Sequence, residues 1–116
     1  MVVARDCLAK KTDENWRSAI NRAYYCAFNI SRDYVDPAKT QLSNERVHKQ
    51  VIDALRAPTR SALEKTLGRR LKRAKEIRTD ADYENPYPNP TLEYHAKFAV
   101  SECQEILNTI SRLKGK

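Results

Sequence analysis

The stretch Ser18-Ala19-Ile20-Asn21-Arg22-Ala23-Tyr24-Tyr25-Cys26-Ala27-Phe28 decides the fold of this chain. It lies within residues 13–35, where apolar residues recur at alternating steps of four and three, the spacing that keeps side chains on one face of a helix. These apolar positions are Trp16, Ile20, Ala23, Ala27, Ile30 and Tyr34. Thr12 or Asp13 can cap the first turn, because a short side-chain oxygen accepts hydrogen bonds from free backbone N–H groups. We therefore predict an amphipathic helix over 13–35 with this stripe in the core.

Four further helices are predicted on either side of this segment, over residues 2–11, 44–56, 61–78 and 90–113. Ser61-x-x-Glu64 forms a capping box that opens the fourth helix, and the prolines of residues 85–90 separate it from the fifth. The positions expected to face inward are Val3, Cys7 and Leu8 in the first helix, Val47, Val51 and Leu55 in the third, Leu63, Leu67, Leu71, Ala74 and Ile77 in the fourth, and Leu92, Ala96, Ala99, Cys103, Ile106, Ile110 and Leu113 in the fifth.

The fold class follows from these patterns together with the composition. The 116 residues include 41% hydrophobic residues and only two glycines, which favours a folded, mostly helical protein. No stretch shows the alternation typical of strands. We predict an all-α protein, an up-and-down bundle of four main helices plus a short N-terminal helix, which forms a single domain over residues 1–116. No apolar run approaches the roughly 18 residues that a membrane span needs, and no signal peptide is evident, so we predict a cytoplasmic location.

The cysteines and histidines give no metal-binding pattern. Cys7, Cys26 and Cys103 are odd in number and widely spaced, which favours reduced thiols. Neither His48 nor His95 has a second ligand at the short spacing that metal sites use. We predict neither a metal ion nor another cofactor.

The net charge of +7 makes an anionic partner plausible. Five basic residues crowd one predicted helix, and Glu76 is the only acidic residue between Arg69 and Ile77. The basic residues are Arg69, Arg70, Lys72, Arg73 and Lys75. A solvated helix face is the usual meaning of such a run, and contact with RNA or an acidic partner is the alternative.

Three motifs together resemble the HEPN domains of prokaryotes, in the subgroup associated with a minimal nucleotidyltransferase. They are Asn-Arg-Ala-Tyr-Tyr-x-Ala-Phe at 21–28, His-x-x-Val-Ile at 48–52 and Arg-x-x-Ala-Asp-Tyr at 78–83. The resemblance covers roughly residues 13 to 113. It implies a homodimeric helical bundle that acts on or binds RNA in a toxin–antitoxin or defence system, with a minimal nucleotidyltransferase as partner. A non-catalytic helical interaction module is the alternative, and a structural bundle unrelated to HEPN proteins is a third possibility.

The chain departs from the catalytic signature of active HEPN ribonucleases, which are metal-independent. Their signature places His four to six residues after Arg, often with Tyr close behind, whereas Asp82 and Tyr83 follow Arg78 here. An ionised Asp can only accept a proton at neutral pH, while imidazole can both donate and accept. Whether the chain is an enzyme therefore stays open. If it is a metal-independent ribonuclease, Arg78 and Asp82 are the candidate catalytic residues.

The candidates for nucleotide or RNA binding are Arg22, Arg69, Arg73, Arg78 and Tyr83, and the resemblance implies that Tyr83 could accept a nucleotide from the partner enzyme. Each has a structural alternative. Arg78 and Asp82 can pair to brace the turn while Tyr83 packs on the bundle, and Arg22 can pair internally with Asp82.

The two histidines receive structural interpretations. His48 can line a groove or cap the edge of the core, and the second interpretation is favoured. His95 is expected to be exposed.

Overall fold

The computed structural model describes residues 2–9, 13–37, 46–83 and 92–115. This part of the chain forms five helices: α1 (Val2–Ala9), α2 (Asp13–Val35), α3 (Val47–Leu55), α4 (Ala62–Tyr83) and α5 (Leu92–Lys114). Its described residues contain no strand, so the all-α prediction is confirmed.

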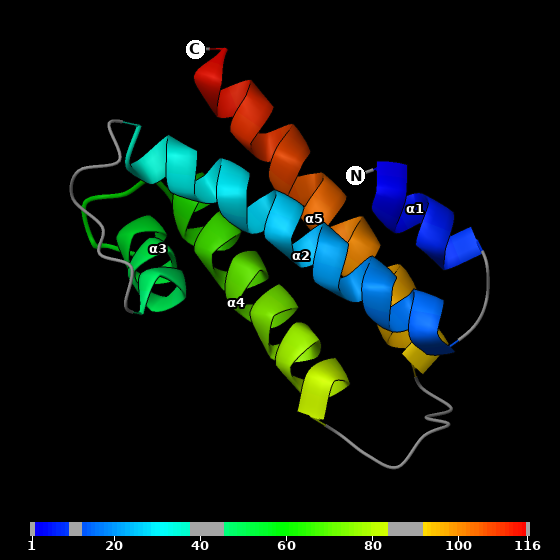
Figure 1. The fold of residues 1–116 in the computed structure, drawn as a ribbon. Helices are drawn as coiled ribbons and strands as arrows, with labels where there is room; N and C mark the ends of the chain where they lie inside the picture. Colours follow the sequence, from blue (N-terminus) through cyan, green and yellow to red (C-terminus); the bar gives the residue numbers. More distant parts are fainter. Residues whose placement is uncertain (1, 10–12, 38–45, 84–91, 116) are drawn as a thin grey trace.

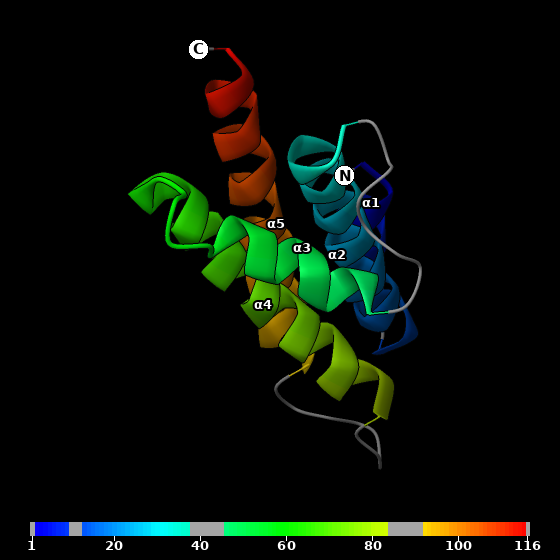
Figure 2. The same ribbon diagram turned by 90° about the vertical axis from the view of Figure 1, so that its left-hand side faces the viewer.

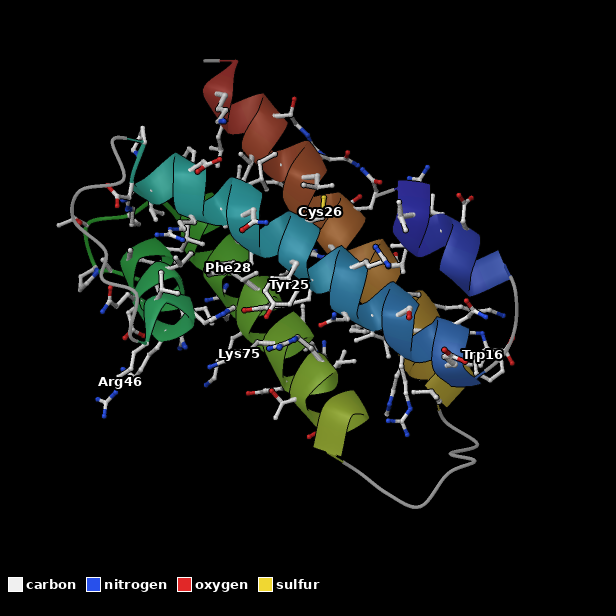
Figure 3. The ribbon with its side chains drawn as sticks, in the orientation of Figure 1. Trp16, Tyr25, Cys26, Phe28, Arg46 and Lys75 are labelled. Carbon is white, nitrogen blue, oxygen red and sulfur yellow. The ribbon has the colours of Figure 1, made fainter. Side chains whose placement is uncertain are left out.

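The helices form a bundle around α2, which packs against each of the other four. The chain runs down α1, up α2, down α4 and up α5, while α3 crosses the outside of α4 (Figures 1 and 2). Figure 3 shows the Tyr25 and Phe28 side chains on the edge of α2 that faces α3 and α4. The shape is elongated, 42 × 29 × 23 Å. No helix in the described ranges is long and apolar enough to cross a membrane.

The predicted helix of residues 13–35 is confirmed, but its buried face is wider than the stripe we identified. Ile20, Ala23 and Ala27 are buried as predicted, and Ala19, Tyr24, Phe28 and Ser31 are buried beside them. The face is wide because all four other helices pack against α2. On α5 the predicted positions from Leu92 to Ile110 are all buried.

Two positions predicted to face inward are wrong. Val3 is 51% exposed and the adjacent Ala4 is buried instead, because a small side chain lets the short α1 lie close to α2. Leu63 is 40% exposed, one turn before the buried run that begins at Leu67. There Glu64 faces α2 through a contact with Tyr34, so the interface at that level is polar.

The predicted end of the fourth helix at Arg78 is also wrong, because α4 continues to Tyr83. The residues after Arg78 include no proline or glycine before Pro86, so nothing local stops the helix. Arg78 therefore lies more than one turn inside α4, rather than at its boundary with the proline segment.

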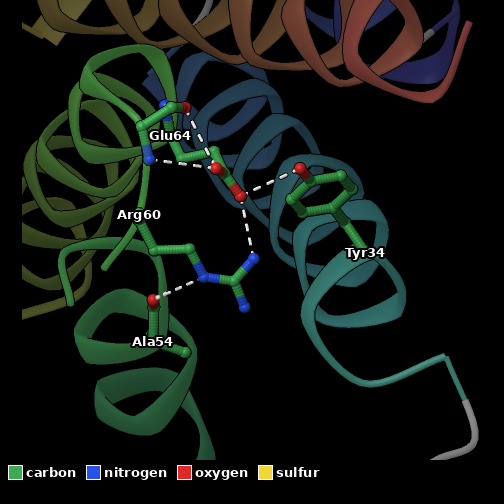
Figure 4. Close-up of polar contacts among 5 residues, drawn as sticks. Tyr34, Ala54, Arg60 and Glu64 are labelled. Atoms are coloured by element: carbon green, nitrogen blue, oxygen red, sulfur yellow. Dashed lines mark hydrogen bonds and ion pairs between the residues drawn. The ribbon is translucent and has the colours of Figure 1, made fainter. Parts of the chain in front are cut away.

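The capping box at Ser61 is confirmed and is part of a larger junction (Figure 4). The Ser61 N–H donates to Glu64 Oε1 at 3.1 Å, and the Glu64 N–H donates to Ser61 Oγ at 3.2 Å. Tyr34 Oη on α2 donates to Glu64 Oε2 at 2.9 Å, and Arg60 Nη1 pairs with the same oxygen at 2.8 Å. Arg60 Nε also donates to the Ala54 carbonyl oxygen on α3 at 3.2 Å. One carboxylate thus connects α2, α3 and α4.

These contacts set the ionisation of Glu64. Its burial favours the neutral acid, but the hydrogen bonds from Ser61, Tyr34 and Arg60 favour the carboxylate more strongly. They lower the pKa of Glu64 from its ordinary 4.5 to about 2. A folded pKa below the unfolded value means that ionised Glu64 contributes stability above about pH 4.5, and that this stability is lost as the pH falls toward 2.

Replacing Glu64 with Gln should lower the free energy of unfolding by about 1–3 kcal/mol at neutral pH, because the amide cannot accept charge-assisted hydrogen bonds from both Arg60 and Tyr34. In urea titrations at about pH 3, the difference in free energy of unfolding between the variant and the wild type should be smaller. At that pH the wild type is losing the stability that ionised Glu64 contributes. Glu105→Gln, at an exposed position on α5, is the matched control. A deficit of equal size at both pH values would contradict this account.

Candidate functional site

Arg78 on α4 is fixed against α2 by two hydrogen bonds. Its Nε donates to Asn21 Oδ1 and its Nη2 donates to Tyr25 Oη, each at 3.0 Å. Its guanidinium carbon lies 4.8 Å from the centre of the Tyr25 ring and 5.6 Å from that of Tyr24, within cation–π range. Two hydrogen bonds and two ring contacts hold the planar guanidinium in one orientation, which reduces the entropy lost when it binds an anion.

His48, in the first turn of α3, contacts the same tyrosines. Its ring stacks on Phe28 with the centroids 4.1 Å apart, and its Nδ1 lies 2.6 Å from Tyr24 Oη. The Tyr25 ring lies edge-on to the imidazole at 6.1 Å between centroids. Three side chains from α2 therefore position this one imidazole.

The fold thus brings Arg78 and His48 into one cluster, which we define as Asn21, Tyr24, Tyr25, His48 and Arg78. Both Arg78 and His48 contact the Tyr24 side chain, although they lie 30 residues apart in the chain. The cluster occupies the junction of α2, α3 and α4, where Figure 3 shows Tyr25 and Lys75. Tyr25 is 36% exposed, so solvent reaches the cluster at this residue.

Burial and neighbouring cations favour the neutral form of His48. Desolvation lowers the pKa of His48 below its ordinary 6.5, and the positive charges of Arg78, Lys75 and Arg32 lower it further. The imidazole is therefore neutral at physiological pH and able to accept a proton. Burial also raises the pKa of Tyr24 well above 10, so its hydroxyl stays protonated.

The hydroxyl of Tyr25 is oriented by Arg78. Because the guanidinium donates to the phenolic oxygen, the Tyr25 O–H is directed away from Arg78 and can donate to another acceptor. The cluster thus offers a fixed cation, a neutral imidazole and a partly exposed phenol, a set of groups that suits a phosphate ester.

The other predicted site residues do not join this cluster. Arg22 is exposed on α2, so it is not the buried partner of an internal ion pair. Arg69 is exposed on α4, where it donates to Thr66, and Arg73 lies over the Phe98 ring at 5.0 Å. The side chains of Asp82 and Tyr83 lie outside the described residues, and so does the predicted Arg78–Asp82 pair.

Sequence reasoning undervalued His48 and missed Tyr24 as part of the site. The available signal was the spacing of Asn21, Tyr24, Tyr25 and Phe28, which places polar and aromatic groups on one edge of α2. No spacing in the sequence could show that His48 on α3 would lie against this edge of α2. His95, expected to be exposed, is half-buried and lies against Tyr94 on α5.

Comparisons with family models, with curated proteins and with solved structures found no match to this chain. Within the described ranges, no group of three His, Cys, Asp or Glu side chains is arranged to hold a metal ion.

Replacing Arg78 with Gln should raise the pKa of His48, because it removes the positive charge that lowers this pKa most, while keeping hydrogen-bonding capacity. The pKa can be measured by NMR titration of the imidazole carbons, with His95→Gln to assign the two histidines. Arg112→Gln, at an exposed position near the end of α5, removes the same charge and should leave His48 unchanged. A pKa of His48 that does not respond to Arg78→Gln would contradict the electrostatic coupling.

Acidification should destabilise the protein through His48. Its folded pKa lies below the unfolded value of 6.5, so the unfolded chain binds the proton more tightly. The contribution of neutral His48 to the free energy of unfolding is therefore fully present above about pH 6.5. It is lost as the pH falls through the folded pKa. His48→Gln should abolish this part of the pH dependence in urea titrations. An unaltered pH profile in the variant would assign the dependence to another group.

Proposed function

We propose that this chain is a HEPN-like protein that binds RNA in the cytoplasm and cleaves it without a metal ion at the Arg78–His48 cluster. One observation supports this proposal above the others: a fixed guanidinium and a neutral imidazole both contact the side chain of Tyr24. The sequence lacks the closely spaced Arg and His of active HEPN ribonucleases, and the cluster supplies both residue types from different helices.

The proposed reaction is attack of a ribose 2′-oxygen on the adjacent phosphorus. His48 accepts the 2′-hydroxyl proton, the new P–O bond forms, and the bond from phosphorus to the 5′-oxygen breaks. The products are a 2′,3′-cyclic phosphate and a 5′-hydroxyl, whose proton comes from the Tyr25 hydroxyl or from water. His48 then releases its proton to solvent, and Tyr25, where it was the donor, regains one from solvent, so the enzyme returns to its starting state.

Arg78 supports this reaction through charge. The phosphate gains negative charge on its non-bridging oxygens as the 2′-oxygen attacks, and a preorganised cation stabilises that charge without further rearrangement. Asn21 and Tyr25 act as positioning residues, because their hydrogen bonds hold the guanidinium in place.

Tyr24 governs the tautomer of His48 in this proposal. When His48 Nδ1–H donates to Tyr24 Oη, the other ring nitrogen is left without a proton and can act as the base. The reverse arrangement, in which Tyr24 donates, leaves the other nitrogen protonated. Substrate binding would select the first tautomer if the 2′-hydroxyl donates to that nitrogen.

The HEPN resemblance extends this proposal to partners. We propose that the chain forms a homodimer and works with a minimal nucleotidyltransferase in a toxin–antitoxin or defence system. In such a pair, the Tyr83 hydroxyl would attack the α-phosphorus of a nucleoside triphosphate and pyrophosphate would leave. The Tyr83 hydroxyl proton would pass to solvent or to a base of the partner enzyme, and the attached nucleotide would add a negatively charged phosphate to residue 83, five residues after Arg78.

The test is cleavage of mixed RNA by the purified chain in excess EDTA, with products analysed for 2′,3′-cyclic phosphate ends. Arg78→Gln and His48→Asn should each lower the cleavage rate by about 100-fold or more, the usual effect of removing a charge-stabilising or proton-transfer group. Arg112→Gln should cleave as the wild type does.

Two results would overturn the catalytic proposal. Full cleavage by both cluster variants would show that another residue set, or a contaminant, is responsible. Folded wild type that binds RNA and leaves it intact would instead favour the non-catalytic interaction module.

A further inference from the structure

A basic groove lies between α3 and α4, beside the cluster but distinct from it. It has a volume of about 390 Å³. A second hollow of about 300 Å³ continues it along α4 and shares Arg56, Lys72 and Glu76 with it. The two together reach from Asp80 back to Arg69, about 16 Å along the axis of α4 at 1.5 Å per residue.

Positive charge dominates the lining of this groove. Six cations line the two hollows, namely Lys49, Arg56, Arg69, Lys72, Arg73 and Lys75. The carboxylates there are Asp53, Glu76 and Asp80, and Asp53 is paired with Lys49 at 2.8 Å. The second hollow has four cations for the single carboxylate of Glu76. Such an excess favours a polyanion over a neutral ligand.

Arg56 lies in the groove because its side chain packs closely against the backbone of α4 at Gly68. It follows the last residue of α3, and its stem crosses α4 at the buried Gly68. A Cβ added at Gly68 would lie only 2.5 Å from Arg56 Cγ. The absence of a side chain at residue 68 therefore lets Arg56 lie across α4 and line both hollows.

Lys75 connects this groove with the cluster. Its side chain lines the groove, and it is also among the charges that act on His48. Figure 3 shows Lys75 on the side of α4 toward α3. A chain of phosphates that leaves the cluster would therefore meet Lys75 first, and then Lys72 and Arg56.

We infer that the groove between α3 and α4 binds the phosphates of single-stranded RNA that flank the nucleotide held at the Arg78–His48 cluster. This inference rests on the proposed function and adds a substrate class to it. Modules for double-stranded RNA span about 16 base pairs, which is far beyond the reach of a groove this short. A basic groove that follows the backbone is how proteins bind single strands without reading their sequence.

The test is binding of a short 2′-O-methyl oligouridylate, followed by fluorescence anisotropy over a range of salt concentrations. Methylation blocks the attacking oxygen, so binding is measured apart from cleavage. The double variant Arg56→Gln/Lys72→Gln should bind at least several-fold more weakly. The slope of log affinity against log salt concentration should fall by about 0.7 for each lost phosphate contact. Arg112→Gln/Lys114→Gln, at the exposed end of α5, changes the net charge equally and should bind as the wild type does.

Gly68→Ala provides a second variant with unchanged charge. Its Cβ should displace Arg56 and weaken binding of the same probe, while circular dichroism confirms that the helices persist. Equal affinity and salt slope in the wild type and the Arg56/Lys72 double variant would overturn the inference. So would displacement of the probe by polyglutamate as readily as by oligouridylate, because the groove would then bind acidic peptides.

Cleavage of a dinucleotide separates this inference from the proposed function. A dinucleotide places one phosphate at the cluster and none in the groove, so the Arg56/Lys72 variant should cleave it at the wild-type rate and show a raised KM only for long RNA. His48→Asn should show the opposite pattern, with lost cleavage and retained binding of the methylated probe. Loss of dinucleotide cleavage in the groove variant would place its effect at the cluster and overturn the inference.

Discussion

The arrangement of α2, α3 and α4 depends on the burial of one tyrosine. The Tyr24 ring is almost fully removed from water, which is favourable for its carbon atoms and costly for its hydroxyl unless that group forms a hydrogen bond. His48 provides the partner, and it does so from the first turn of α3. The stacking of the same imidazole on Phe28 adds apolar contact. The need of the Tyr24 hydroxyl for a hydrogen-bond partner thereby helps to determine where α3 lies. The Arg78 guanidinium on α4 also contacts the Tyr24 ring.

The junction concentrates positive charge in a way that stability alone does not require. After burial, the positive charges of Arg78, Lys75 and Arg32 all disfavour a proton on His48. Like charges held close together raise the free energy of the folded state, and a bound phosphate would relieve that repulsion. The Glu64 junction is different, because its carboxylate is already satisfied by Arg60, Tyr34 and Ser61 within the protein.

Much of the fold could be predicted from local patterns, and the failures have a common cause. Periodicity located α2 and α5, and the capping box located the start of α4. Periodicity identifies an apolar face but gives no information on where the neighbouring helices end, and for that reason Val3 and Leu63 were misplaced. Arg78 was identified as a site residue, whereas its proximity to His48 depends on how α3 crosses α4. That crossing is a tertiary feature, and no spacing within one helix encodes it.

The continuation of α4 past Arg78 has a consequence for local motion. Helix ends open more readily than helix interiors, because their last backbone groups have fewer partners. Arg78 is anchored to α2 by Asn21 and Tyr25, more than one turn before the end of the helix at Tyr83. The final turn can therefore unwind and reform while the guanidinium keeps its place. Fraying at this end would give another protein access to the backbone near Tyr83 without dismantling the junction of the three helices.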